Sequence, residues 1–147
     1  MTRNTLGLCL VALLTFGGCC CLTSGTWEDN SGNWQRAFKS TKPDDVKIIH
    51  SKYWRSPHWT YEFEYFFEIE ANPKLKEQLF TQNKLRQLTG SDVATAKDST
   101  FGEAPAWFAP KAADAYEIWI YEEEPRGSFK VLIDKETGTI FLTDYQV

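Results

Sequence analysis

The segment from Thr60 to Glu70 constrains the fold most, because its side chains alternate in character at nearly every position. The apolar series comprises Tyr61, Phe63, Tyr65, Phe67 and Ile69. Side chains of a β-strand point alternately to opposite faces, so this period of two predicts a strand with one buried face. We expect a solvated acidic face opposite, formed by Glu62, Glu64, Glu68 and Glu70.

Neighbouring segments extend this strand into a sheet. Val46 to Trp54 is β-branched and aromatic, and the R-S-P-H stretch that follows predicts a hairpin turn into the acidic strand. Three further strands are expected over residues 115–122, 128–134 and 139–147, with Gly138 at a tight turn that needs a positive φ. Val131 and Ile133 are expected to join the core.

One helix is predicted before the hairpin and one after it. Ser31 is a candidate N-cap for a short helix that carries Trp34 and Phe38 on one face. A second helix begins with Asn72 as the cap and Pro73 at the first helical position, and breaks near Asn83.

These elements predict a single α+β domain over residues 32–147. Its order is helix-β-β-helix-loop-β-β-β, which gives a mostly antiparallel five-stranded sheet with helical cover on one face. The loop spans residues 89–114 and shows no clear periodicity, which is long for a loop without a role. Its P-A-W-F-A-P stretch sets Trp107 and Phe108 between two prolines. These rings either pin the loop to the core or form a binding surface for a partner.

The N-terminus has the features of a secretory signal. Arg3 precedes eleven apolar or small residues from Leu6 to Phe16, and two glycines and a cysteine follow. Eleven helical residues extend only about 16 Å, against about 30 Å for the hydrocarbon core of a bilayer. Residues 1–18 are therefore expected to be a signal peptide and not a permanent membrane span.

The F-G-G-C stretch that ends at Cys19 resembles the lipobox of bacterial lipoproteins. The resemblance implies that Cys19 receives a diacylglycerol and becomes the first mature residue, with residues 19–31 as a lipid-anchored tether. Because Cys20 follows instead of an aspartate, the sorting pattern of this family implies the periplasmic face of the outer membrane, or of the cell membrane where no outer one exists. Reversible palmitoylation of the cluster Cys19–Cys21 is the alternative.

Several function classes are disfavoured. Residues 22–147 contain no cysteine, so the domain has neither an internal disulfide nor a thiolate metal site. The formal net charge of −4 argues against nucleic acid. His50 and His58 could bind a transition metal together with Glu62, but two histidines without a fixed spacing are a weak signal. Ordinary surface or half-buried histidines are the favoured interpretation. The chain lacks a G-x-S-x-G stretch, an S-x-x-K stretch and a phosphate loop. We therefore expect no cofactor and no resident metal.

The resulting hypothesis is a lipid-anchored, non-catalytic binding or accessory protein of the bacterial cell envelope. It would contact a protein or a glycan through Trp107 and Phe108, because Trp and other large rings are enriched at binding hot spots. One alternative is an envelope hydrolase that uses a pair from Glu62, Glu64 and Glu68 as acid and base. Another, by analogy only, is an immunity protein against a secreted toxin.

Overall fold

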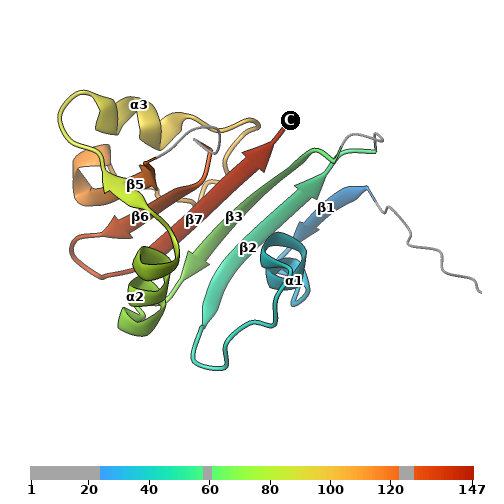
Figure 1. The fold of residues 1–147 in the computed structure, drawn as a ribbon. Helices are drawn as coiled ribbons and strands as arrows, with labels where there is room; N and C mark the ends of the chain where they lie inside the picture. The colour runs from blue at the N-terminus through green and yellow to red at the C-terminus, as the bar shows by residue number, and fades with distance from the viewer. Residues whose placement is uncertain (1–23, 58–60, 123–127) are drawn as a thin grey trace, which may run out of the picture.

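The computed structural model describes residues 24–57, 61–122 and 128–147. Within them the chain forms an antiparallel sheet of seven strands in the order β1-β2-β3-β7-β6-β5-β4 (Figure 1). The strands are β1 (Gly25–Glu28), β2 (Ile48–Arg55), β3 (Phe63–Ile69), β4 (Leu85–Gln87), β5 (Tyr116–Tyr121), β6 (Lys130–Asp134) and β7 (Ile140–Gln146). The helices are α1 (Asn33–Phe38), α2 (Pro73–Gln82), α3 (Asp92–Asp98) and the 3-10 turn η1 (Ala113–Ala115).

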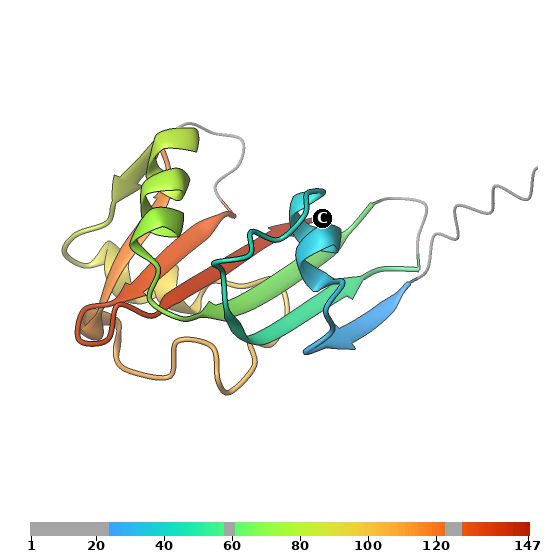
Figure 2. The same ribbon diagram turned by 90° about the horizontal axis from the view of Figure 1, so that it is seen from below.

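The sheet is covered on both faces (Figure 2). Helices α1 and α2 pack on the face that carries Tyr65, Phe67 and Ile69, which we call the helix face. Helix α3 and residues 99–115 pack on the opposite face, which carries Glu64 and Phe66 and which we call the loop face. Each face therefore has its own hydrophobic cluster. None of the described helices is long and apolar enough to cross a membrane.

The predicted register of the acidic strand is confirmed. Tyr65, Phe67 and Ile69 are almost fully buried on the helix face, together with Val131 and Ile133, and Phe63 is half-buried beside them. β3 pairs with β2 in the predicted hairpin and with β7 on its other side. The predicted α+β class and antiparallel sheet are therefore confirmed.

The predicted strand count of five is wrong, because β1 and β4 were missed. β1 pairs with β2, so the sheet already includes Gly25–Glu28, inside the segment expected to be a tether and ahead of residue 32. β4 follows the predicted helix break at Asn83 and pairs with β5. Strands of four and three residues are too short to display a period of two, and backbone pairing with a longer neighbour defines them.

The solvated glutamate face and the helical cover on one face only are also wrong. Glu64 is only 5% exposed and Phe66 1%, because α3 and residues 99–115 lie over them. Glu68 is half-buried opposite His50, whereas Glu70 is exposed and pairs with Lys47 at 3.2 Å. The alternation marks the two faces correctly, but both of them are inside the fold over most of β3.

The predicted cap of α2 and the predicted turn at Gly138 are confirmed, whereas the predicted cap of α1 at Ser31 is wrong, because α1 begins after Gly32 and has no side-chain cap. The Asn72 Oδ1 accepts the Leu75 N–H at 2.9 Å and caps α2, which begins at Pro73. Gly138 has φ +73° in the turn between β6 and β7, as expected. In the same turn the Asp134 carboxylate accepts the N–H groups of Glu136 and Thr137.

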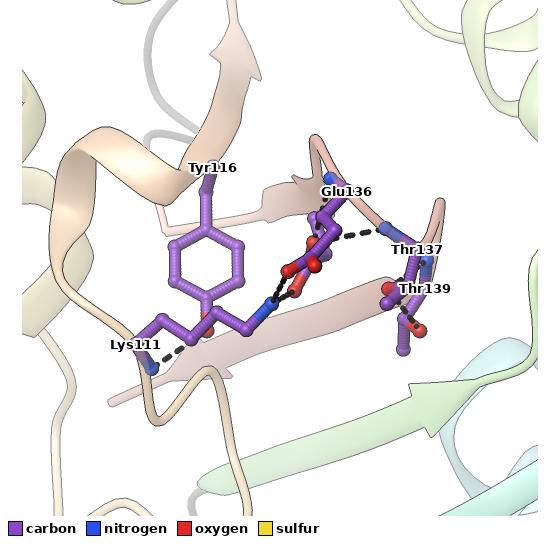
Figure 3. Close-up of polar contacts among 6 residues, drawn as sticks. Lys111, Tyr116, Glu136, Thr137 and Thr139 are labelled. Carbon is purple, nitrogen blue, oxygen red and sulfur yellow. Dashed lines mark hydrogen bonds and ion pairs between the residues drawn. The ribbon is translucent and has the colours of Figure 1, made fainter.

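Lys111 ties residues 105–112 to this turn (Figure 3). Its ammonium lies 2.8 Å from a Glu136 oxygen and 2.9 Å from an Asp134 oxygen, and its backbone N–H donates to the Tyr116 hydroxyl at 2.8 Å. The two carboxylates raise the pKa of Lys111, and Lys111 in turn lowers the pKa of Asp134. The segment of residues 99–115, which covers the loop face, is thus held near its C-terminal end by charge-assisted hydrogen bonds.

Phe67→Ala is expected to lower the free energy of unfolding by about 3–5 kcal/mol, because it leaves a cavity in the helix-face core. Glu64→Ala is expected to cost about 1–3 kcal/mol, since it removes the acceptor of two backbone N–H groups. Glu70→Ala, at an exposed ion pair, should change the value by less than about 0.5 kcal/mol. Urea unfolding measures all three, and a costly Glu70→Ala would contradict the assigned faces.

Candidate functional site

A groove of about 490 Å³ runs between α1 and α2 on the helix face. Its floor is the sheet, through Tyr65, Phe129, Leu142 and Asp144. α1 and the chain after it form one wall, and α2 forms the other. α1 and α2 lie over different parts of this face (Figure 2), and the groove lies between them, above strand residues that are themselves almost fully buried.

The wall from α1 is aromatic. Trp34 and Phe38 lie four residues apart, so both rings point to the sheet, with 4.4 Å between their centroids. Phe38 also packs edge-on against Tyr65 at 5.3 Å. The buried indole N–H of Trp34 has no hydrogen-bond partner among the described residues, which costs free energy that the surrounding rings must offset.

The wall from α2 carries unengaged amides. Gln78 and Gln82 are one helical turn apart and line the same groove. No described residue forms a hydrogen bond with either side chain, in contrast to Asn83, whose Oδ1 accepts the Tyr121 hydroxyl at 2.9 Å. An amide offers donors and an acceptor together, so this wall presents free hydrogen-bonding groups of both kinds.

The groove is poor in charge. Among the described residues, Asp144 is the one carboxylate in the lining and no Lys or Arg lines the space. The Asp144 Oδ1 accepts the Ser128 hydroxyl at 2.7 Å. Burial, and then the Asp144 carboxylate, raises the pKa of Tyr65 well above its usual value, so that phenol stays neutral. Aromatic rings, neutral amides and one carboxylate suit an uncharged ligand with many hydroxyl or amide groups.

The two rings proposed from the sequence do not form one exposed surface. Phe108 is 7% exposed and packs edge-on against Phe66 at 5.0 Å and Phe141 at 5.7 Å, so it pins residues 105–110 to the loop-face core. Trp107 is half-buried and stacks on His50, with 5.4 Å between ring centroids. Of the pair, only Trp107 retains a solvent-facing part.

His50 belongs to a small polar arrangement at the edge of the sheet. Its Nδ1 lies 3.2 Å from an Asp29 oxygen, and the other oxygen of Asp29 accepts the Ser51 N–H. The Ser51 N–H, and secondarily His50, lower the pKa of Asp29. No cluster of three or more His, Cys, Asp or Glu residues that could hold a metal occurs in the part of the chain that the structure describes. His58, Trp59 and Cys19 lie outside the described residues.

Two buried charges hold the start of the long segment, and we call them the Glu64–Lys130 clamp. The Glu64 oxygens accept the N–H groups of Phe101 at 2.8 Å and Gly102 at 3.0 Å. Lys130, 2% exposed, donates to the carbonyls of Ala96 and Ser99, at the end of α3. The anion takes backbone donors and the cation takes backbone acceptors, so each buried charge is compensated.

The sequence anticipated part of these sites. The apolar faces of both helices were expected from their spacing, but nothing in the pattern singled out Gln78 and Gln82, because their role depends on where α2 lies over the sheet. α3 was missed inside the long loop, although Ser91 and Asp92 are residues that favour a helix start.

Comparison with family models, with curated proteins and with solved structures gives no match to this chain.

Lys130 predicts a measurable pH dependence of stability. Burial lowers its pKa to about 8, whereas an exposed lysine in the unfolded chain titrates near about 10.4. Between these values the unfolded state binds more protons than the native state, so stability rises with pH. The native protein should gain stability relative to Lys130→Met from about pH 7.5 to about pH 10 in urea unfolding. A constant difference between the two proteins over that range would contradict the assignment.

Proposed function

We propose that the protein is a lipid-anchored, non-catalytic binding or accessory protein of the bacterial cell envelope, and that it binds its ligand in the groove between α1 and α2. The observation that carries the binding role is the pair of unengaged amides, Gln78 and Gln82, beside an aromatic floor and wall. Preformed apolar concavities with a few convergent polar groups are the usual form of ligand sites. The anchor rests on the lipobox-like stretch that ends at Cys19.

The groove favours a neutral glycan over the other partners considered. The C–H face of a sugar ring packs on aromatic side chains such as Phe38, and its hydroxyl groups match the donors and acceptors of the two glutamine amides. The described residues of the lining include no Lys or Arg, which disfavours phosphorylated or otherwise anionic ligands. A segment of an envelope protein is the competing occupant, and the binding experiment below separates the two.

The hydrolase alternative is less well supported. An acid–base pair needs two carboxylates that are free to exchange protons with a substrate. Both oxygens of Glu64 are occupied by the N–H groups of Phe101 and Gly102, and Glu68 faces His50 on the loop face. The glutamates are therefore structural in this proposal, which keeps the function to binding.

The proposed location is the periplasmic face of a membrane, reached through lipid on Cys19. Each buried methylene contributes about 0.8 kcal/mol, so two or three acyl chains anchor a protein stably where one does not. The acidic net charge is consistent with a partner other than nucleic acid.

Cys19→Ser is expected to abolish lipid attachment and normal signal removal. Fractionation of cells and mass spectrometry of the N-terminal peptide measure both effects, with Cys21→Ser as the matched control that keeps the lipobox residue. A Cys19→Ser protein that is still cleaved normally and still sediments with membranes would remove the anchor from the proposal.

The groove is tested by calorimetric titration of the protein with an N-acetylglucosamine tetramer. Gln78→Ala with Gln82→Ala is expected to weaken binding by at least roughly fivefold, because neutral hydrogen bonds are lost. Gln35→Ala, on α1 but outside the groove lining, should leave the affinity unchanged. Binding of neutral peptides but not of the tetramer, with the same sensitivity to Gln78 and Gln82, would replace the glycan by a protein partner. Equal effects of both sets of variants would exclude the groove.

A further inference from the structure

Three aromatic side chains gather on the loop face at the end of the sheet where β1 begins. Trp54, Phe101 and Tyr145 form this aromatic triplet, with ring centroids 5.8 Å apart between Trp54 and Phe101 and 6.1 Å apart between Phe101 and Tyr145. Phe101 is 52% exposed, and the other two rings are partly exposed. The strand register explains the cluster, since Trp54 and Tyr145 both lie opposite Glu64, one on each side of β3.

The backbone that presents Phe101 is firmly held. The Glu64–Lys130 clamp fixes the chain from Ala96 to Gly102, with a buried charge on each side of the tip. A Cβ at Gly102 would lie only 2.9 Å from a Glu64 oxygen, so a larger residue there would displace the carboxylate from its present position. Buried charges are costly unless they are compensated by hydrogen bonds. Glu64 and Lys130 find these hydrogen bonds on the backbone around Phe101, which holds the exposed ring in place. Its exposure is therefore a property of an ordered loop.

The surroundings of the triplet combine apolar side chains with charges of both signs. A hollow of about 320 Å³ beside Phe101 is lined by Trp54, Phe66 and Thr26 and by the charged residues Lys52, Glu64 and Glu103. This composition offers no strong field for an ionic partner. It resembles a surface that rests at a boundary between water and an apolar phase, where amphipathic rings are enriched.

The chain enters the sheet next to this surface. Gly25 pairs with Arg55, and Thr26 pairs with Trp54, so the first strand residues lie beside the triplet. Cys19 precedes Gly25 by six residues, and six residues of extended chain reach at most about 20 Å. A lipid on Cys19 would keep the triplet close to the bilayer surface.

We propose that the aromatic triplet rests in the interfacial layer of the bilayer to which Cys19 anchors the chain, an inference that rests on the proposed lipid anchor. The groove between α1 and α2 lies on the opposite face of the sheet and would then open away from the membrane. Because the described residues that line the hollow beside the triplet carry charges of both signs and form no basic patch, the contact depends on apolar burial. It persists at high salt and does not require anionic lipid.

The test uses the full lipidated chain with Cys20→Ser and Cys21→Ser, so that one introduced thiol is available for labelling. In the Phe101→Cys protein an environment-sensitive fluorophore is attached at the triplet. In the matched control, Gln35→Cys, the same fluorophore is attached at an exposed position of α1. Both proteins are reconstituted into phosphatidylcholine vesicles, with and without bromine on the lipid acyl chains. The label at residue 101 is expected to shift to the blue and to be quenched by the brominated lipid, and the label at residue 35 to do neither.

Flotation of the vesicles and the mass of the N-terminal peptide separate the two proposals. If the protein is lipidated and floats but the label at residue 101 stays as aqueous as the control, the membrane contact is overturned and the anchor stands. A label that becomes shielded only after envelope proteins are added also overturns it, because the triplet is then a protein interface. If Cys19 carries no lipid and the protein does not float, the anchor itself falls. Unchanged melting temperatures exclude misfolding as the cause of any of these results.

Discussion

The burial of β3 on both faces is the constraint on which the rest of the structure depends. The helix face of this strand is covered by aromatic rings and aliphatic side chains, and the loop face places a carboxylate, Glu64, among apolar neighbours. A buried carboxylate must find hydrogen-bond donors, and the segment after α3 supplies two backbone N–H groups. The position of that segment is therefore linked to β3, an inner strand of the sheet, by one buried carboxylate.

The segment from residue 99 to residue 115 is ordered by three fastenings of different kinds. The Glu64–Lys130 clamp holds its beginning, the buried ring of Phe108 holds its middle, and Lys111 holds its end against Asp134 and Glu136. Hydrophobic burial supplies the largest part of such stabilisation, and the charged contacts select one backbone path over others. This explains how a stretch without periodicity becomes a defined layer over the sheet.

The two faces of the sheet thereby support two different surfaces. The helix face has an aromatic groove with one carboxylate between α1 and α2, whereas the loop face ends in the aromatic triplet beside the first strand. If Cys19 carries the proposed lipid, the two surfaces face in opposite directions: the triplet would face the bilayer, and the groove would face the periplasm. Trp107, which the sequence analysis proposed as a binding residue, stacks on His50 and belongs to the layer that covers the loop face.

The sequence by itself determined the hairpin of β2 and β3, the register of β3, the caps of α2 and the α+β class, because these follow from local periodicity and from residues with fixed conformational preferences. Only the tertiary structure decided that β1 and β4 join the sheet, that α3 and the long segment cover the glutamate face, and that Gln78 and Gln82 line a groove. Alternation reports that a strand has two unlike faces, but it does not report what lies over each face. The alternation predicts that Glu64 faces solvent with the other glutamates of the segment. Its burial depends on the N–H groups of Phe101 and Gly102, nearly forty positions away, which local periodicity does not report.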